Sequence, residues 1–582
     1  MGLLIMIKLH CMNRLHTWLL FSILLIGFIL RIYQLEQTPN GFASDEAAIG
    51  YNAYSILKTG RDEFGKSFPL SFKSFGEFKA PLYIYLTIPF IAIFGLNEFA
   101  TRLPAAIFGI STIFFLYLLI NKLFRNQKLA LASALILTII PWHLQFTRIA
   151  YEGSLVVFLL TLSTYFFLRG IDSNRFYFIS FAGFALIPYA HYSVRLFLPL
   201  FIISLLIIYR RTIRSKILSI FFAILLGIII IYPLIPQMVS SDGLNRASYI
   251  SVFTDPGESF AINEKIAEHA WSNFKISIPT RILHNKIMQF TQKFIQNYIA
   301  HFDFSFLFIK GDEDHLFQTP NIGLIPLILF LPLLWGISKL ITYQNPQKLL
   351  VLSWLFLAPI PSSLTRLSAS SNRDFIIIIP ICIIIGVGLF DIFKQIKGHY
   401  KLIAYITCVL FIFEYGLYLD AYYIHASIKN SRDIRVIGKD LVNMVKPYMD
   451  QYPNIWVTSN SGGYIHFLFY LKYPPNIYQN EAKLTKINVY GFGTIEHFGK
   501  FGFAKVPKYF DFSKNILYLA QAAEIPKNVA PMSYVYYPDG QLAYALFDTQ
   551  ILTKQDPESN ILYKPENQDI YGTIIPLDEK TN

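Results

Sequence analysis

The sequence predicts a polytopic α-helical membrane protein with a small α/β domain at its C-terminal end, and two observations lead to this fold class. First, 54% of the 582 residues are apolar and only 15% are charged, whereas a soluble globular protein carries roughly 25% charged residues. Second, the apolar residues form long runs of Ile, Leu and Phe up to residue 420, and beyond it these runs shorten.

A transmembrane helix needs ~20 mostly apolar residues. About eleven stretches are candidates for such helices, namely 15–33, 103–121, 128–146, 153–168, 176–192, 196–209, 217–236, 320–340, 349–364, 374–393 and 402–420. Lys8 and Arg14 precede the first stretch, which places the N-terminus in the cytoplasm by the positive-inside rule. With strict alternation of the spans, the cations of 210–216 also fall on the cytoplasmic side.

The apolar run 81–96 is not expected to span the membrane. Counting it as a span would place the basic clusters around Arg125 and Arg210 on the outer side, and Pro89 interrupts it. We therefore expect an interfacial helix that lies along the outer leaflet. A second amphipathic segment, 281–301, is also expected on the membrane surface.

The predicted organisation is a transmembrane domain over residues 1–420 and an extracytoplasmic domain over residues 421–582. The plasma membrane is the expected location, with outer loops at 34–102 and 237–319. In the second domain, β-prone stretches at 454–458 and 533–537 alternate with a helix-like stretch at 464–471.

The outer loop 34–102 contains the first candidate site. A helix over 45–57 is expected to begin at Ser44, a good N-cap, and to end before Gly60. Its first turn carries Asp45 and Glu46, which could do no more than stabilise the N-terminal dipole. Carboxylates close to a membrane are costly, however, and are functional candidates. An acid here could act as a general base or hold a divalent metal, for which Asp45 is the candidate.

Cations are expected near these acids. Lys79 could be a snorkelling lysine or a phosphate ligand. The outer ends of the spans also carry arginines that the positive-inside rule disfavours, which suggests an anionic ligand outside; these are Arg102, Arg148, Arg195, Arg366 and Arg373. Arg373 could bind a phosphate bidentately or pair with its neighbour Asp374.

Other charged groups leave alternatives open. Glu152 is a further external acid, or the partner of Arg148 four residues earlier. The acidic stretch 311–315 could hold a cation, but a solvated turn fits it better. The net charge of +13 could indicate a nucleic-acid partner, but the cations cluster at the ends of apolar runs, so no nucleic acid is expected. No P-loop and no Gly-x-Ser-x-Gly motif occurs.

The order of these features resembles a known superfamily. A span is followed by an external Asp45-Glu46 on an amphipathic helix, by Lys79-Ala-Pro-Leu-Tyr-Ile-Tyr85, and by Arg102-Leu-Pro-Ala-Ala106 at the next span. This arrangement resembles the GT-C superfamily of membrane glycosyltransferases, in particular the protein O-mannosyltransferase and aminoarabinose transferase group. Looser matches are Thr147–Gly153 and Tyr192–Pro199, and the resemblance covers residues 15–420.

The resemblance implies a helical bundle with juxtamembrane helices on the outer side, a polyprenyl-phosphate sugar donor and inverting transfer to a hydroxyl of a protein, glycan or lipid. Asp45, with Glu46 beside it, would be catalytic. Lys79 and Arg373 match positions that hold the donor phosphate. Glu152 matches a second acidic position near the acceptor, where Glu77 is grouped with it, and metal dependence varies across the superfamily.

Two departures concern the donor contacts. Ala47 and Ala48 follow the acidic pair where some relatives have Arg, and Ser370 stands where many have His. The functional hypothesis is therefore an inverting glycosyltransferase in the lipid bilayer. The alternatives are a transporter or translocase of a lipid-linked glycan, which would need charged or broken helices near the membrane midplane, and a glycan polymerase or ligase of similar topology.

Overall fold

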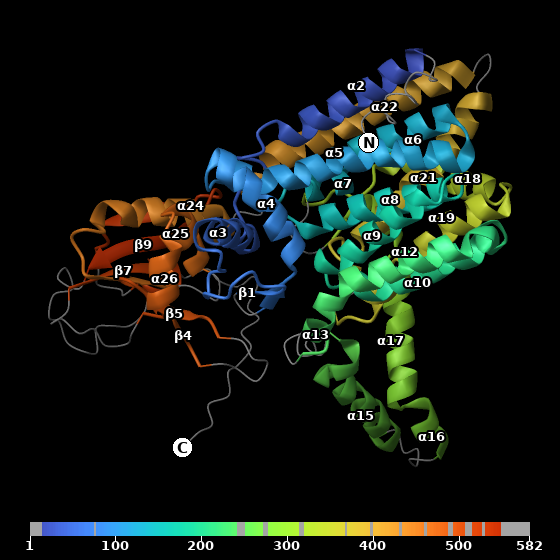
Figure 1. Ribbon diagram of the computed structural model, residues 1–582. Helices are drawn as coiled ribbons and strands as arrows, with labels where there is room; N and C mark the ends of the chain where they lie inside the picture. Colours follow the sequence, from blue (N-terminus) through green and yellow to red (C-terminus); the bar gives the residue numbers. More distant parts are fainter. Residues whose placement is uncertain are drawn as a thin grey trace.

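A computed structural model describes twelve segments of the chain: 14–74, 77–240, 251–271, 278–312, 319–366, 369–395, 400–429, 434–458, 463–486, 493–506, 515–525 and 530–548. Within them the chain is mostly helical, with a sheet in the C-terminal region (Figure 1). The expected fold class is confirmed at this level.

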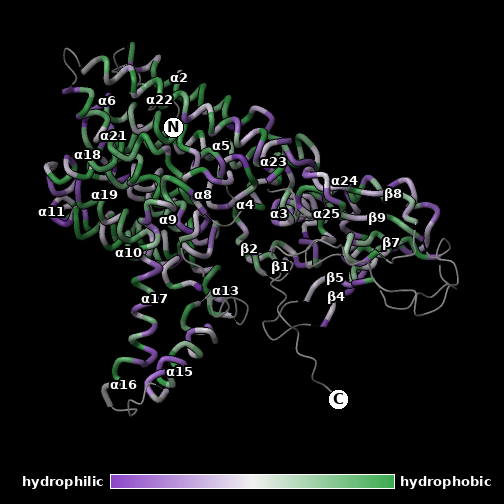
Figure 2. The backbone as a smooth tube through the Cα atoms, turned by 180° about the vertical axis from the view of Figure 1, so that it is seen from behind, coloured by the Kyte–Doolittle hydropathy of each residue, from purple (hydrophilic) through white to green (hydrophobic). Residues whose placement is uncertain are grey.

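A bundle of apolar helices makes up most of the molecule, and Figure 2 shows that hydrophobic residues are concentrated in it. Its helices are α2 (Arg14–Ile32), α5 (Glu98–Phe124), α6 (Gln127–Ile139), α7 (Pro141–Phe146), α8 (Glu152–Gly170), α9 (Arg175–Leu186), α10 (Val194–Ile208), α11 (Arg210–Ile213), α12 (Ile217–Ile231), α18 (Phe330–Leu340), α19 (Asn345–Leu357), α20 (Ile360–Ser363), α21 (Ile378–Gln395) and α22 (Tyr400–Asp420). Each stretch expected to span the membrane contains at least part of a helix.

Proline divides or shortens some of these stretches. The expected span 128–146 is two helices, because Pro141 begins α7 and has no N–H to continue the hydrogen bonding of α6. The expected span 320–340 becomes helical only near its end, where α18 follows a 3-10 turn at Leu327–Leu329. Five described helices are long and apolar enough to cross a membrane, among them α2, α5 and α8. The number of spans stays a prediction.

A group of shorter elements lies at one end of the bundle, and Figure 2 places α11 at the opposite end from α3. These elements are α3 (Ser44–Thr59), the antiparallel strands β1 (Phe72–Ser74) and β2 (Glu77–Lys79), α4 (Pro81–Phe94), α13 (Ile235–Met238), α15 (Pro256–Trp271), α16 (Ile278–Leu283) and α17 (Lys286–Ala300). The run 81–96 is thus helical, while its interfacial position stays a prediction. The segment expected as one helix over 281–301 is the end of α16 followed by α17.

The sequence located α3 closely but assigned the wrong N-cap. The N-cap is Ala43, whose backbone N–H donates to the Glu46 carboxylate at 3.2 Å, and Ser44 is the first helical residue. Because Glu46 supplies this contact, the helix does not depend on the Ser44 hydroxyl. Gly60 ends the helix with φ +68°, as expected of a glycine in the left-handed region.

The C-terminal region contains a mixed seven-stranded sheet in the order β4-β5-β6-β3-β7-β9-β8, in which β3 is parallel to β6 and β7. Its strands are β3 (Asn454–Val457), β4 (Lys483–Leu484), β5 (Ile495–Phe498), β6 (Phe501–Phe503), β7 (Ile516–Gln521), β8 (Ser533–Tyr536) and β9 (Leu542–Asp548). The helices α23 (Ala426–Lys429), α24 (Ile434–Val445), α25 (Tyr464–Tyr470) and α26 (Pro475–Glu481) accompany it. The expected strands near 454 and 533 and the helix near 464 are confirmed, whereas a domain boundary at 420 stays a prediction.

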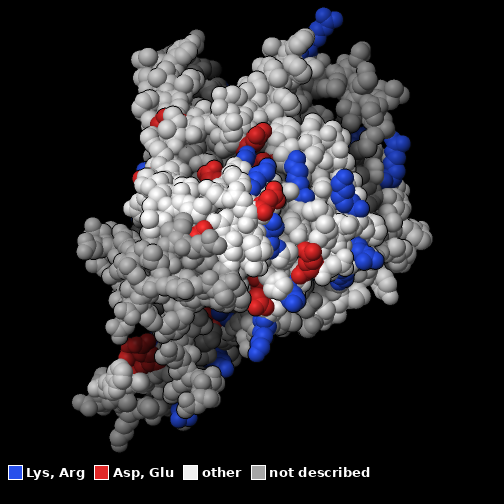
Figure 3. Space-filling model, turned by 90° about the vertical axis from the view of Figure 1, so that its left-hand side faces the viewer, with Lys and Arg blue, Asp and Glu red and all other residues white. Residues whose placement is uncertain are grey.

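The C-terminal region packs directly on α3. The Tyr51 hydroxyl donates to the Tyr473 carbonyl at 2.9 Å, and the Phe42 N–H donates to the Arg435 carbonyl at 2.9 Å. Figure 3 looks at this end of the molecule and shows Lys and Arg side chains interspersed with Asp and Glu. The helix that carries Asp45 therefore lies between the bundle and the C-terminal region, as Figure 1 also shows.

Gly50 permits this close packing, so we predict that Gly50→Ala destabilises the protein. A Cβ at residue 50 would lie 2.6 Å from a ring carbon of Phe469 in α25 and 2.7 Å from the Thr101 hydroxyl in α5. Overpacking of this kind costs about 1–3 kcal/mol, which thermal unfolding of the purified protein would measure. Gly416→Ala is the control, because nothing lies within 4 Å of a Cβ there. Equal unfolding temperatures for both variants would contradict the prediction.

Candidate active site

Asp45 and Lys79 form an ion pair that joins the first turn of α3 to strand β2. The Asp45 side chain is 48% exposed, while the Lys79 side chain is only 4% exposed. Lys79 pairs in register with Phe72 of β1, whose side chain is also buried. The hairpin thus holds a buried ammonium beside a carboxylate that solutes can reach.

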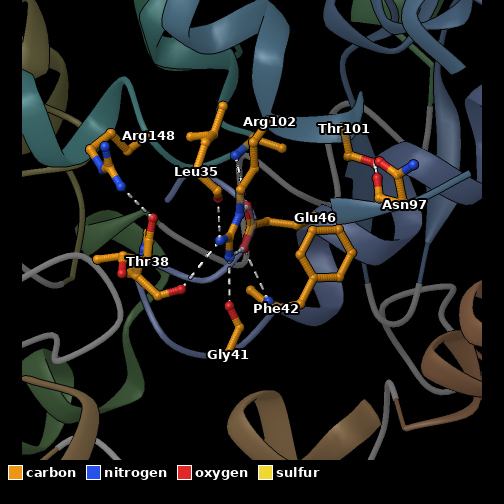
Figure 4. A network of polar contacts seen from close by, with 12 residues as sticks. Leu35, Thr38, Gly41, Phe42, Glu46, Asn97, Thr101, Arg102 and Arg148 are labelled. Atoms are coloured by element: carbon orange, nitrogen blue, oxygen red, sulfur yellow. Dashed lines mark hydrogen bonds and ion pairs between the residues drawn. The ribbon is translucent and has the colours of Figure 1, made fainter. Parts of the chain in front are cut away.

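Glu46, the next residue, has a different environment, which Figure 4 shows. The Arg102 guanidinium donates to both Glu46 carboxylate oxygens, at 2.8 and 2.9 Å, and both side chains are buried. The same carboxylate accepts the Ala150 N–H at 2.8 Å. With the Ala43 N–H, both oxygens are fully engaged, so Glu46 connects α3, α5 and the 147–151 turn.

Two of the arginines expected to meet an external anion instead bind groups inside the protein. Arg102 also donates to the Leu35 and Pro39 carbonyls, at 3.1 and 3.2 Å (Figure 4). Arg148 is buried and donates to the carbonyls at the end of α2, including Tyr33 at 2.7 Å. These bonds take the place of the alternative in which Arg148 pairs with Glu152. Burial makes backbone carbonyls the partners of these cations, because an unpaired buried charge is costly.

Arg373 lies at the end of a short loop, 369–373, that three residues from distant parts of the chain hold in place. The Trp142 indole donates to the Ser371 carbonyl at 2.9 Å, and the Tyr151 hydroxyl donates to the Asn372 carbonyl at 2.7 Å. Asp312 accepts both the N–H and the hydroxyl of Ser371 at 2.6 Å. The solvated turn expected at 311–315 is therefore wrong for Asp312, and residues 313–315 lie outside the described part of the chain.

The Arg373 guanidinium itself donates to the Thr365 hydroxyl at 2.7 Å and is half-buried. Its neighbour Asp374 is buried 2.8 Å from the Nε2 atom of His301. The ion-pair partner of Asp374 is therefore His301 and not its neighbour Arg373. Sequence spacing gave no sign of this pair, because His301 and Asp374 lie far apart in the chain.

Tyr151 connects Glu152 with Arg373. Burial raises the pKa of Tyr151, the Glu152 carboxylate raises it further, and the Arg373 guanidinium acts in the opposite direction. Both charged groups are therefore within electrostatic reach of one hydroxyl. Glu152 begins α8, and Tyr151 is its N-cap. The 147–153 motif thus lies between the α3 turn, which it meets through Ala150, and the Arg373 loop.

Glu77 begins β2, and its side chain is outside what the structure describes. Among the described residues, no group of three or more His, Cys, Asp or Glu is arranged to hold a metal ion. The expected roles of Asp45, Glu46, Lys79, Glu152, Glu77 and Arg373 remain predictions.

Sequence reasoning missed Glu63, a fully buried acid in the same outer loop. The Tyr464 hydroxyl donates to one carboxylate oxygen at 3.4 Å, and the other oxygen is buried without a hydrogen-bond partner. Burial, followed by the nearby Asp62 charge, raises the pKa of Glu63 to about 8, and Lys79 opposes this shift. Its position two residues after Arg61, in a polar turn, gave no sign of burial, because Tyr464 comes from the distant C-terminal region.

Part of the chain matches a known protein family. Residues 78–236 match the family model described as dolichyl-phosphate-mannose-protein mannosyltransferase. A relative in Bacillus subtilis (strain 168), named "Putative mannosyltransferase YycA", is 26% identical over 215 residues, which are 36% of this chain and 30% of the relative. The alignment thus spans less than a third of that protein.

Among solved structures, ArnT from Cupriavidus metallidurans, bound to undecaprenyl phosphate, has a TM-score of 0.50 at 12% identity, covering 91% of this chain and 97% of that chain. The oligosaccharyltransferase AglB from Archaeoglobus fulgidus has a TM-score of 0.46 at 12% identity, covering 78% of this chain and 63% of that chain. The family model and the relative bear out the resemblance to membrane glycosyltransferases that the sequence indicated, and the likeness to ArnT shows a similar fold.

We predict that Glu46→Gln destabilises the protein. Loss of the Glu46 charge leaves Arg102 buried without its anion, and breaking a buried pair costs about 3–5 kcal/mol. The measurement is the thermal unfolding of each variant. Glu98→Gln is the control, because its partner Lys439 is half-exposed and can be solvated. A Glu46→Gln variant as stable as wild type would show that the pair is dispensable.

The raised pKa of Glu63 also predicts a pH dependence of stability. The folded protein binds a proton at Glu63 that the unfolded chain, with a pKa near 4.5, releases. Folding stability should therefore fall as pH rises from about 4.5 towards about 8, the pKa of the folded state. Unfolding temperatures measured across this range should fall less steeply in Glu63→Gln, which mimics the neutral acid. The exposed Glu496→Gln variant should keep the wild-type slope, and parallel curves for all three proteins would contradict this account.

Proposed function

We propose that this chain, a glycosyltransferase of the GT-C superfamily, moves a sugar from a polyprenyl-phosphate donor to a hydroxyl acceptor, with inversion, on the outer face of a membrane. The observation that carries the proposal is the ion pair of an accessible acid, Asp45, with a buried cation, Lys79, at one end of an apolar bundle. A lipid-linked donor with a phosphate needs both a site for its anion and an apolar surface for its chain.

Asp45 is assigned the role of general base, in preference to Glu46. The acceptor hydroxyl gives its proton to the Asp45 carboxylate while its oxygen forms a bond to the anomeric carbon of the sugar. The bond from that carbon to the phosphate oxygen breaks on the opposite side, and the lipid phosphate leaves with the electron pair. Glu46 has no free oxygen for this step, because Arg102 and two backbone N–H groups occupy it.

Lys79 and Arg373 are assigned to the departing phosphate, whose negative charge grows as the bond breaks. An ammonium group has three N–H donors, so Lys79 can keep Asp45 in place and still reach a phosphate oxygen. The loop that Trp142, Asp312 and Tyr151 hold gives Arg373 a fixed position, and such pre-organisation is worth more than charge alone.

Glu152 is assigned to the acceptor side. Its carboxylate and the Arg373 guanidinium have opposite charges and opposite effects on the pKa of Tyr151. Figure 2 supports the outer-face assignment, because α11, with Arg210 and Arg211, lies at the end of the bundle opposite to α3. The positive-inside rule then puts α3, and Asp45 with it, on the outer side. Membrane location itself agrees with the ArnT fold and the apolar helices.

We predict that Asp45→Asn lowers kcat for sugar transfer about 100-fold or more, because a positioned general base contributes about 10²–10⁴-fold. The assay uses the purified protein with a panel of polyprenyl-phosphate monosaccharides, and it includes a chelator titration to determine metal dependence. Asp172→Asn is a matched control: Asp172 is 45% exposed and pairs with Lys122 at 2.7 Å, but its loop follows α8 at the other end of the helix.

Lys79→Gln in the same assay should raise the donor KM about tenfold or more, since charge-assisted hydrogen bonds to phosphate are strong, while Lys122→Gln leaves it unchanged. Full transfer activity in Asp45→Asn would remove Asp45 from the chemistry. No transfer by the wild-type protein from any donor of the panel would count against the lipid-phosphate sugar class itself.

A further inference from the structure

A cavity of about 210 Å³ lies on the opposite face of the β1–β2 hairpin from the Asp45–Lys79 pair. Phe78 lines it, and successive side chains of a strand point to opposite faces, so Phe78 and Lys79 serve different sites. The other walls come from the turn after α3, from the start of α10 and from the end of α13.

Two cations line this cavity, Lys66 and Arg195. Among the described residues that line it, none is acidic. Arg195 has a fixed orientation, because its Nε and Nη2 atoms donate to the Pro188 carbonyl at 3.3 and 3.2 Å and its guanidinium stacks 4.1 Å from the centre of the Tyr192 ring. A fixed guanidinium with a nearby lysine is an arrangement suited to a phosphoryl group.

The remaining polar groups are suited to hydroxyls. Ser71 and Tyr192 line the cavity with their hydroxyl oxygens 3.1 Å apart. Gln237 also lines it, and its amide oxygen is buried without a hydrogen-bond partner. A buried acceptor of this kind is costly unless a donor reaches it. A ligand with O–H groups beside an anion would supply that donor.

We propose that this cavity is a second anion-binding site, which receives a phosphoryl group flanked by hydroxyls, such as a glycerol-phosphate or sugar-phosphate head, presented by the acceptor. The identification of the ligand as the acceptor rests on the proposed function, but the existence of an anion-binding site does not. The volume is below the ~300–1,000 Å³ of pockets for drug-sized ligands, so it fits one polar head and no lipid chain. Lys66 and Arg195 would hold the phosphoryl oxygens, and Gln237 would accept from a hydroxyl.

The test measures how fast a water-soluble acetylating reagent modifies Lys66 in the full-length protein, held in phosphatidylcholine nanodiscs and analysed by mass spectrometry. Glycerol 3-phosphate, inorganic phosphate and nanodiscs containing phosphatidylglycerol are the three probes, which separate a soluble from a lipid source. Saturating glycerol 3-phosphate or phosphatidylglycerol should slow Lys66 acetylation about fivefold or more, because a lysine in contact with phosphate is shielded. Lys58, an exposed lysine outside the cavity, is the internal reference.

Two variants make the assignment specific. Arg195→Gln should abolish the protection by every probe. Gln237→Leu, a change on the partly exposed α13, should weaken protection by glycerol 3-phosphate and leave that by inorganic phosphate unchanged. Unchanged Lys66 acetylation with all three probes in the wild-type protein would overturn the site, as would protection that survives Arg195→Gln.

Donor consumption in the same nanodiscs separates this inference from the proposed function. If the site feeds the acceptor to Asp45, a protecting probe should raise the rate of donor consumption in wild type and not in Arg195→Gln. Protection without any change in a measurable donor consumption would overturn the acceptor assignment. Absence of donor consumption under every condition would instead overturn the proposed function, while the protection data would still decide whether the anion site exists.

Discussion

The buried ion pair of Arg102 and Glu46 is the interaction on which the arrangement of the site depends. Each partner would be an uncompensated charge in the interior without the other, so neither can move alone. Their further bonds reach the Leu35 and Pro39 carbonyls and the Ala150 N–H, which ties the end of α2, the start of α3, α5 and the 147–151 turn to one point. Asp45 is fixed as a consequence, because it lies on the same helical turn.

The C-terminal region completes this constraint from the other side of α3. Its contacts include hydrogen bonds, such as the Gln479 amide with the Asp62 carbonyl at 2.8 Å and the His466 ring with the Phe42 carbonyl at 2.8 Å, and aromatic contacts, such as Phe42 with Phe469. Gly50 lets the helices come together, and Glu63 is buried under Tyr464. The proposed catalytic helix is thus held between two bodies of structure, although it lies in what the sequence describes as a loop between spans.

The β1–β2 hairpin borders two sites, one on each of its faces. Lys79 meets Asp45 on one face, and on the other face Phe78 lines a cavity whose described charged residues, Lys66 and Arg195, are cations. Successive residues of a strand point to opposite faces, so one short hairpin contributes a residue to each site.

The sequence by itself determined the features that depend on residues close together in the chain. Apolar runs located the helices of the bundle, Gly60 located the end of α3, and β-prone stretches located the strands near 454 and 533. The resemblance selected Asp45, Lys79 and Arg373 as candidates. Only the tertiary structure distinguished Asp45 from Glu46, put Arg102 and Arg148 inside, and brought Asp312 to the Arg373 loop. Adjacent residues of a helix point about 100° apart, so two neighbouring carboxylates look equivalent in sequence until distant segments pack around them and leave one in the core and the other open to solvent.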